Sequence, residues 1–346
     1  MAELTAEQLE NAANAALAYF FEKGSTFDQS IQDKPLLKKM KDRQKTFPGG
    51  NRNIELRVVG DYVTQIMGFT NDDTVTYGNP TTIKVLTYPW KEIHAGIKVP
   101  FTELKIDGIT VSDSTTGKST RDVSGADMQR LAGIFENKLA DMAEGWARGT
   151  NTMFWLDGTQ DAKQVPGILS FILDDPTSAT VVAGVDQSTN TWWRNRANLA
   201  INASTPANQV LINTLQTELR QLRRYGGKPD VMYAGSTFIE ALEKEIRANG
   251  QYTQDGNTGS QDPSMGDLFF KKIPVFYDPT LDDLGYAKRA YWLDTSTILP
   301  MVMDGEDMKT HNPARPEDKY VLYRAITWTG GLICRKRNAN GVYAIL

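Results

Sequence analysis

The chain has 346 residues, of which 40% are hydrophobic and 10% aromatic, so it can bury a folded core and is not of disordered composition. Its formal net charge is −4, with acids and bases interspersed, which argues against a dedicated nucleic-acid binder with a basic face. The single cysteine, Cys334, excludes an intrachain disulfide framework and fits a reducing compartment. No apolar run approaches the roughly 20 residues that would cross a bilayer, and we expect no signal peptide after Met1.

Residues 1–52 are predicted to form an N-terminal arm. Apolar residues from Leu9 to Phe21 recur at helical spacing, which favours a helix near the start of the chain. The stretch Lys34–Arg57 then holds eight Lys or Arg residues against two acids. It contains Pro48-Gly49-Gly50, so we expect an arm rather than a core element. Charge alone leaves open whether this stretch is a solvated linker or contacts nucleic acid or a partner.

Residues 53–98 are predicted to form an extended β-hairpin loop. Apolar and polar residues alternate with a period of two around residues 54–58, 83–85 and 97–101, with turn-forming residues between the first two runs. A two-stranded ribbon is marginally stable alone in water, so either its own domain or a neighbouring subunit must cover it. The residues predicted to contact a neighbouring subunit are Ile54, Leu56, Ile83, Val85 and Trp90.

Residues 99–157 are predicted to form a domain built on one long helix, at residues 122–149. Its apolar residues recur at spacings of three and four, which places them on one face. At roughly 1.5 Å per residue this helix is about 40 Å long and can serve as a spine. The predicted core residues of the spine helix are Met128, Leu131, Phe135, Leu139, Met142 and Trp146.

Residues 158–304 are predicted to form a mixed α/β region. The leucines from Leu211 to Leu222 predict a helix that ends at Gly226-Gly227, and Phe238, Leu242 and Ile246 predict a second. Short apolar runs at residues 230–234, 273–277 and 290–293 predict strands. Residues 305–346 are predicted to return as strands to the domain of the long helix, with Asn340-Gly341 as a hairpin turn.

The residues that carry most enzyme chemistry are scarce, so we predict no enzyme, no cofactor and no metal site. His94 and His311 are the only histidines, and with one cysteine they cannot form a His/Cys metal cluster. Gly117-Lys118-Ser119 resembles the end of a phosphate-binding P-loop, but the first glycine of that motif is replaced by Ser112. A nucleotide-binding enzyme that uses this turn stays as an alternative. Trp192-Trp193 can stack on bases or pack at an interface, although core packing is the commoner fate of such a pair.

Three further segments complete the order of elements: a helix-to-strand step at Gly226–Met232, a strand leading to a turn at Phe270–Val275, and closing strands at Trp328–Arg335 and Asn338–Tyr343. Arm, β-hairpin excursion, long helix, α/β region and closing strands, in this order, resemble the major capsid protein of tailed bacteriophages, which has the Hong Kong 97-type fold. The resemblance spans nearly the whole chain and rests more on the order of elements than on any one motif.

The resemblance implies an α+β capsid fold with an extended loop at 53–98, a peripheral domain at 99–157 and 305–346, and an axial domain at 158–304. It implies a structural protein that self-assembles as hexamers and pentamers into an icosahedral shell around double-stranded DNA. The implied location is the virion, with assembly in the cytoplasm of a host bacterium. Because the excursion begins near residue 53, the resemblance implies a separate scaffolding protein or assembly without one, together with a portal and an optional decoration protein. An encapsulin-like shell protein is the alternative within the same class.

Overall fold

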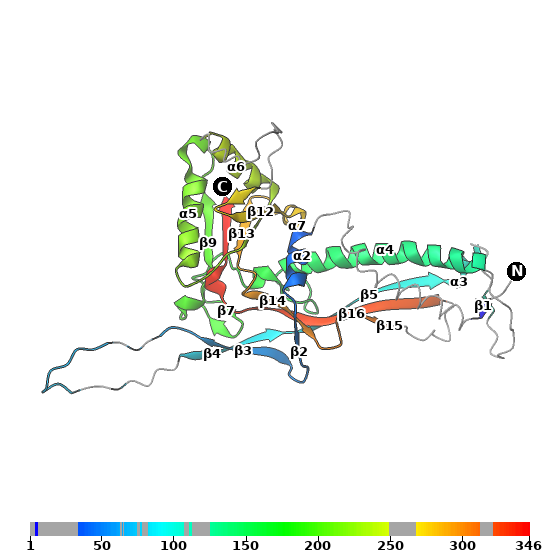
Figure 1. The fold of residues 1–346 in the computed structure, drawn as a ribbon, viewed down its shortest axis with the longest axis horizontal. Helices are drawn as coiled ribbons and strands as arrows, with labels where there is room; N and C mark the ends of the chain where they lie inside the picture. The colour runs from blue at the N-terminus through cyan, green and yellow to red at the C-terminus, as the bar shows by residue number, and fades with distance from the viewer. Residues whose placement is uncertain are drawn as a thin grey trace. The chain divides into compact units, whose positions relative to one another are not determined.

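A computed structural model describes residues 4–5, 34–62, 64, 66–74, 77, 82–106, 111–112, 125–248, 268–311 and 321–346 (Figure 1). The chain divides into two compact units. Unit 1 takes its described residues from Met1–Lys34, Glu92–Thr152 and Val302–Thr329; unit 2 takes them from Pro35–Lys91, Met153–Met301 and Gly330–Leu346. The predicted helix near the start of the chain lies outside the described residues.

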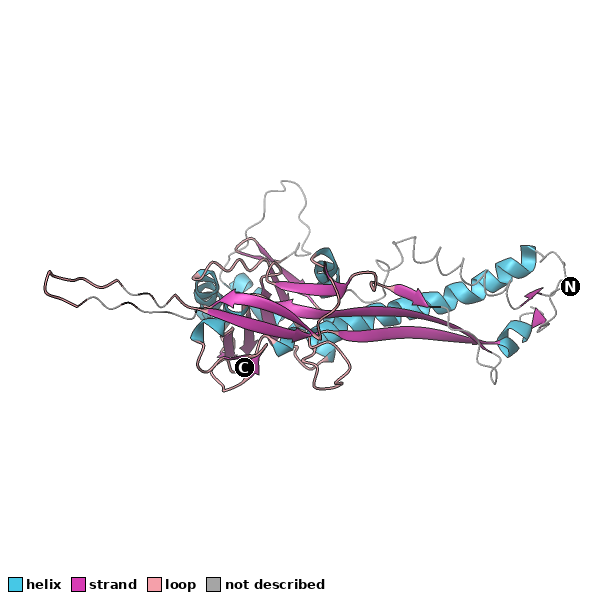
Figure 2. Ribbon diagram, turned by 90° about the horizontal axis from the view of Figure 1, so that it is seen from below, coloured by secondary structure: helices cyan, strands magenta, loops and turns pink. Residues whose placement is uncertain are grey.

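Unit 1 combines one long helix with a ladder of long strands. Helix α4 (Gly125–Trp155) runs alongside strands β5 (Lys91–Pro100) and β16 (Val321–Cys334), as Figures 1 and 2 both show. Strand β16 pairs with β5 and, on its other side, with β15 (Lys309–His311). Lys138 of α4 donates to Glu103 of the short helix α3 (Phe101–Ile106), with 2.8 Å between Nζ and Oε2. A parallel pair of two-residue strands, β1 (Leu4–Thr5) and β6 (Val111–Ser112), completes the described part of this unit.

The long helix does not stop at Gly149 as predicted but continues to Trp155. The reason is the burial of its last turn, where Met153, Phe154 and Trp155 are each at most 4% exposed. In unit 2 the Trp155 indole donates to the carboxylate of the buried Asp278, with 2.8 Å between Nε1 and Oδ2. Such packing outweighs the roughly 1 kcal/mol by which glycine disfavours a helix. None of the helices in the described parts of the chain has the length and apolar content that crossing a bilayer requires.

On the helix, Leu139 and Met142 are buried and Trp146 is half-buried. The side chains of Met128, Leu131 and Phe135 lie outside the described residues.

Unit 2 is built on a six-stranded sheet with the order β11-β12-β10-β13-β17-β9. Strand β10 is parallel to β12 and antiparallel to β13, while β17 is antiparallel to β13 and parallel to β9. The strands are β9 (Arg196–Ile201), β10 (Val231–Ala234), β11 (Phe269–Phe270), β12 (Ile273–Tyr277), β13 (Arg289–Leu293) and β17 (Gly341–Ile345).

Two helices, α5 (Val210–Arg223) and α6 (Ser236–Ala248), pack on this sheet through one apolar cluster. Leu211, Leu215 and Phe238 are fully buried there, against Trp292 of β13. The carboxylate of the buried Glu245 on α6 accepts the backbone N–H groups of Leu211 and Ile212, both at 2.9 Å. An acid in this position satisfies two free N–H groups of the first turn of α5 and the positive end of its dipole.

The remaining elements of the described chain are short. They comprise α7 (Pro279–Asp283), β2 (Lys45–Phe47), β14 (Ile298–Met303), β7 (Val181–Val182) and β8 (Val185–Asp186), with 3-10 turns at Ile168–Ser170, Thr191–Trp193, Pro206–Asn208 and Arg337–Ala339. Strand β14 pairs with β16 and with β2.

The prediction that residues 305–346 all return to the domain of the long helix needs a correction at its C-terminal end. Strand β17 lies between β13 and β9 in the sheet of unit 2, and Asn340-Gly341 is not a hairpin turn. The alternation of apolar residues indicates a strand but does not identify its partners. All five residues of β17 are buried, as in a strand covered on both faces.

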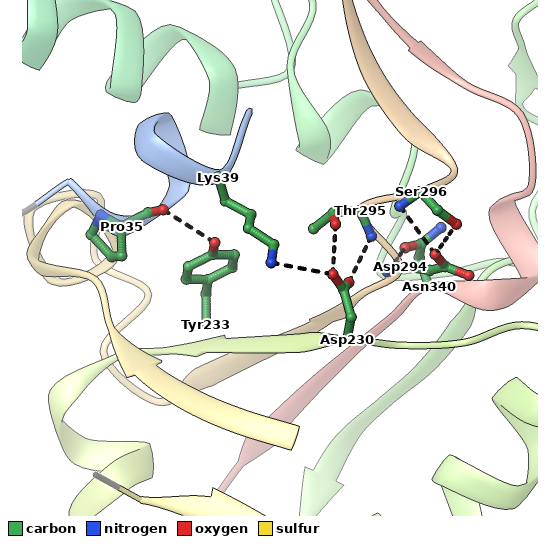
Figure 3. Close-up of polar contacts among 8 residues, drawn as sticks. All are labelled: Pro35, Lys39, Asp230, Tyr233, Asp294, Thr295, Ser296 and Asn340. Carbon is green, nitrogen blue, oxygen red and sulfur yellow. Dashed lines mark hydrogen bonds and ion pairs between the residues drawn. The ribbon is translucent and has the colours of Figure 1, made fainter. Parts of the chain in front are cut away.

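The prediction that the basic N-terminal stretch is an arm rather than a core element is also wrong in part. Residues Pro35–Asp42 form a helix, α2, whose Leu36 and Met40 are fully buried. Figure 3 shows how α2 is attached within unit 2. The Tyr233 hydroxyl donates to the carbonyl of Pro35 at 3.2 Å, and Lys39 pairs with Asp230 at 3.6 Å. The many lysines concealed two apolar residues four apart, which is one turn of a helix.

The hairpin between β11 and β12 has an unusual turn. Its two central residues, Lys271 and Lys272, have positive φ angles of 48° and 68°. Two-residue hairpins of this kind usually have Asn-Gly, because a side chain in the left-handed region costs about 1–2 kcal/mol. Two exposed lysines therefore occupy strained positions at one edge of the sheet.

We expect Lys272→Gly to raise the free energy of unfolding by up to about 1 kcal/mol, since glycine removes the strain at this φ. Urea denaturation measures the change. Lys288→Gly is the matched control, because Lys288 is equally exposed but outside the left-handed region, and it is expected to lower the stability. Equal effects of the two substitutions would contradict the strain.

Candidate functional site

The feature of unit 2 that its own packing does not explain is the end of a long hairpin. Strands β3 (Asn53–Val59) and β4 (Ile83–Pro89) are antiparallel and lie side by side in Figures 1 and 2. Ile54 is opposite Tyr88, and Val59 is opposite Ile83. Since opposite residues share a face, the ribbon has two distinct faces.

The inner face is buried near the open end of the ribbon. Ile54, Leu86 and Tyr88 are at most 7% exposed, and Leu56 is half-buried. The Tyr88 hydroxyl donates to the carbonyl of Cys334 at 2.5 Å, and its ring meets Phe171 edge to face at 5.6 Å. Burial raises the pKa of Tyr88 well above its usual value. This end of the ribbon is part of the core of unit 2.

One backbone hydrogen bond and one close contact with an indole ring hold the ribbon to the rest of unit 2. The N–H of Thr87 donates to the carbonyl of Ala183 at 3.0 Å, in the turn between β7 and β8. Gly60 lies so close to Trp192 that an added Cβ would be 2.7 Å from the indole ring. Glycine is therefore required at residue 60, where Gly60 N–H donates to Thr82 at 2.8 Å and closes the ladder.

Beyond these contacts the ribbon is apolar and exposed. On the outer face Val59 is 48%, Val85 47% and Ile83 54% exposed. In the loop between the strands, five further large apolar side chains are at least 67% exposed: Tyr62, Ile66, Met67, Phe69 and Tyr77. Monomeric proteins rarely expose so many apolar side chains on one segment, and such a surface is typical of an interaction site. We call these eight residues the loop surface.

A local turn interrupts the loop surface. Thr70 donates its N–H and its hydroxyl to the Asp73 carboxylate at 2.8 and 2.9 Å, and Asp73 N–H donates to the carbonyl of Thr70 at 3.0 Å. The hydrogen bonds from the backbone and side chain of Thr70 hold the pKa of Asp73 below its usual value. The loop therefore presents a defined acidic turn between apolar side chains.

The five predicted contact residues do not lie on one surface. Ile54 and Leu56 are on the inner face, and Ile54 is buried by unit 2 itself. Ile83 and Val85 are on the exposed outer face. Trp90 is half-buried and donates its indole N–H to the carbonyl of Asn51 at 2.9 Å. Ile54 is therefore a core residue, while Ile83 and Val85 belong to the loop surface.

The apolar residues of the loop are absent from the predicted contact residues, because only the turn-forming residues of the segment 60–82 entered that prediction. The density of large apolar side chains among Gly, Asn, Asp and Thr was the available signal. The Trp192-Trp193 pair is part of the packing beneath the ribbon: Trp193 is 1% exposed and donates to the carbonyl of Val182 at 3.1 Å.

No group of acids, histidines or cysteines suited to a metal ion occurs within the described residues. His94 is exposed on β5, and the His311 ring lies 2.6 Å from the Thr327 hydroxyl. Gly117-Lys118-Ser119 lies outside the described residues.

Cys334 is fully buried, and burial raises its pKa to about 12. We expect native protein at about pH 8 not to react with a chromogenic disulfide reagent, because the thiolate is the nucleophile. The thiol is expected to react at once in denaturant. Val181→Cys, at a position 62% exposed, is the positive control in the folded state. Rapid reaction of native Cys334 would show that the strand around it opens.

No model of a known protein family matches the chain, and no curated protein matches its sequence. Its structure, however, is similar to solved capsid structures. One is the capsid asymmetric unit of cyanophage A-1(L), with a TM-score of 0.67 and 16% identity over 91% of this chain and 93% of that chain. Another is the capsid of Myoviridae phage XM1, with a TM-score of 0.56 and 12% identity over 92% and 94%. A third is the capsid of a native GTA particle, with a TM-score of 0.55 and 13% identity over 92% and 93%.

These matches cover nearly the whole of each chain, so the likeness is not confined to one motif. The chain therefore has the α+β fold of phage capsid proteins, as its order of elements predicts.

Proposed function

We propose that this chain is the major capsid protein of a tailed phage, and that copies of it assemble as hexamers and pentamers into an icosahedral shell around double-stranded DNA. The observation that carries the proposal is the loop surface: eight large apolar side chains exposed at the end of an anchored ribbon, on a fold shared with phage capsids. The proposed role is structural rather than catalytic, and the proposed location is the virion.

A second copy of the chain is the occupant we propose for the loop surface. A closed shell requires each copy to present a surface that a different surface of its neighbour covers, which is a heterologous contact. A segment held only at its base can reach such a neighbour without disturbing its own unit. Interfaces of standard size bury roughly 1,600 Å² in total, so several modest contacts of this kind can hold a shell while misplaced subunits still leave.

The same fold and surface also suit an encapsulin-like shell, whose copies assemble around protein cargo. Nucleic acid in particles purified from the natural source favours the phage shell, and protein cargo favours the compartment. A scaffolding protein, a portal and a decoration protein are further partners that we propose for the phage shell, together with assembly in the host cytoplasm.

Replacement of residues 61–81 by Asn-Gly is expected to leave the subunit folded but unable to form shells. Gly60 and Thr82 are already joined by a hydrogen bond, so a two-residue turn can close the ladder there. The cut retains the buried Leu86, which a longer deletion from Val63 to Thr87 would remove. Negative-stain microscopy and analytical ultracentrifugation measure the outcome. Normal shells from the shortened chain would refute this role for the loop.

A pair of substitutions tests the outer face alone. Val59→Lys with Ile83→Glu places opposite charges directly across the ladder, which keeps the ribbon paired while removing its exposed apolar pair. We expect the unfolding free energy to change by less than about 1 kcal/mol and shell yield to fall at least tenfold. Phe269→Lys, at a position 55% exposed on β11 of the six-stranded sheet rather than on the ribbon, is the control and should assemble. Equal yields from both variants would argue against an interface at the outer face.

A further inference from the structure

A second unusual surface of unit 2 is a basic patch at the end of α5. It comprises five cationic residues, Arg220, Arg223, Arg224, Lys228 and Lys336. Arg220 and Arg223 lie in the last turn of α5, Arg224 is its C-cap residue, and Lys228 follows after Tyr225-Gly226-Gly227. Lys336 reaches the patch from the far end of the chain, where its ammonium donates to the carbonyl of Tyr225. Two separate segments therefore bring cations to one place.

The position at a helix end explains only part of this patch. Basic residues in the last turn interact favourably with the carbonyl end of the helix dipole, which accounts for Arg220 and Arg223. Arg224 and Lys228 lie beyond the helix, and Lys336 is more than a hundred residues away in the sequence. Like charges repel each other wherever they lie within a Debye length of about 10 Å, because salt screens them only partly over that range.

Three acids lie near the patch, and each has other hydrogen-bond partners. The buried Asp294 accepts the backbone N–H of Lys228 at 2.9 Å and the hydroxyl of Ser296 at 2.5 Å. Glu218, two residues before Arg220, is held by Arg196 through two hydrogen bonds of 2.9 and 3.0 Å. Asp230, two residues after Lys228, accepts from Thr295 and pairs with Lys39 (Figure 3). None of the five patch cations forms an ion pair with another described residue. The patch thus has an excess of positive charge in a chain whose net charge is −4.

The geometry of the patch suits a phosphate backbone. Tyr225 is 62% exposed, and the Arg224 guanidinium lies over its ring at 5.4 Å from the centroid. Four of the five cations are exposed and Lys336 is half-exposed. Arginine guanidinium groups match phosphate oxygens in a two-pronged geometry. Exposed cations without a closed pocket suit contacts that follow a duplex backbone without reading bases.

We infer that this basic patch contacts the phosphate backbone of double-stranded DNA, which makes the end of α5 the part of unit 2 that meets the packaged genome. The inference rests on the proposed shell function. A few contacts per copy, repeated over many copies, hold DNA without a tight individual site, since each phosphate contact adds a salt-dependent contribution. The patch is thus small in each subunit and large in a lattice.

The test is the salt dependence of binding to a long duplex. Wild-type full-length chain, below its assembly concentration, is titrated by fluorescence anisotropy over a range of salt concentrations. The patch variant carries Arg220→Gln, Arg223→Gln and Arg224→Gln, which keep helix propensity and side-chain length. The control carries Lys163→Gln, Lys244→Gln and Lys288→Gln, which removes the same charge from exposed positions of unit 2.

The logarithm of the binding constant decreases with the logarithm of the salt concentration. We expect the steepness of this decrease to be smaller by about 2–3 in the patch variant, since each phosphate contact contributes about 0.9 to it. The control slope is expected to stay within about 0.5 of wild type. Lys228→Gln alone should lower the slope by about 1, which keeps the test decisive if the triple variant does not fold. A wild type that does not bind DNA, or an equal fall in patch variant and control, would overturn the inference.

Shell assembly is measured in parallel on the same proteins. Shells from all three, with no difference in slope, would remove the inference and leave the proposed function standing. A wild type that forms no shells would remove the proposed function, whatever the slopes. A patch variant that keeps its slope but no longer assembles would show that the patch binds a neighbouring copy, which also overturns the inference.

Discussion

The constraint on which the rest of unit 2 depends is a buried arginine. Arg337 is 1% exposed, and its guanidinium donates to the carbonyls of Phe171 and Trp193 at 2.5 and 3.0 Å. It also donates to the side-chain oxygens of Gln187 and Asn195 at 3.1 and 3.0 Å. These acceptors are all neutral, and burial lowers the pKa of Arg337 to about 10, so the side chain stays charged at neutral pH. Such a cation is stable inside a protein only if every acceptor is held in place, which forces residues 171–195 into one arrangement around the C-terminal segment.

That arrangement is what allows the ribbon to extend. The loops that Arg337 holds supply the Phe171 ring and the Ala183 carbonyl, which contact β4, and the Trp192 ring, which packs against Gly60 just after β3. An unsupported two-stranded hairpin is marginal in water, so its exposed apolar end would otherwise collapse or mispair. With the base fixed, the apolar side chains of the loop surface stay exposed and available. The buried Arg337 thus stabilises the base of the ribbon, and the ribbon in turn presents the exposed loop surface.

The sequence predicted the elements of the fold well because apolar spacing reports local structure directly. The leucines from Leu211 to Leu222 and the run Ile273–Tyr277 coincide with α5 and β12 within a residue or two. What failed depended on partners distant in the chain. The charge of Pro35–Asp42 is typical of a solvated linker, and only the folded structure shows that its Leu36 and Met40 are buried. The sequence of β17 likewise contains no local feature that predicts β13 and β9 as its neighbours. The assignment of residues to the two faces of the β3–β4 ribbon also depends on a partner that is distant in the chain. A register shifted by one residue would have placed Ile83 on the same face of the ribbon as Ile54, and the 23 residues between the strands do not determine that register.

The two surfaces that the packing of unit 2 leaves unexplained differ in chemistry in a way that suits different occupants. The loop surface is apolar around an acidic turn at Thr70–Asp73, and hydrophobic burial against a protein neighbour is not screened by salt, which strengthens it where the ions are excluded from the surface. The patch at the end of α5 is cationic and exposed to solvent, so its interactions weaken steeply as salt rises. A shell that must stay assembled while it releases its contents benefits from this separation. Ionic conditions then change the affinity of the shell for nucleic acid without weakening the contacts between subunits. In the proposed shell, the chain separates these two interactions by placing one on a ribbon fixed through Arg337 and the other at the C-terminal end of α5, the helix whose N-terminal end is capped by Glu245.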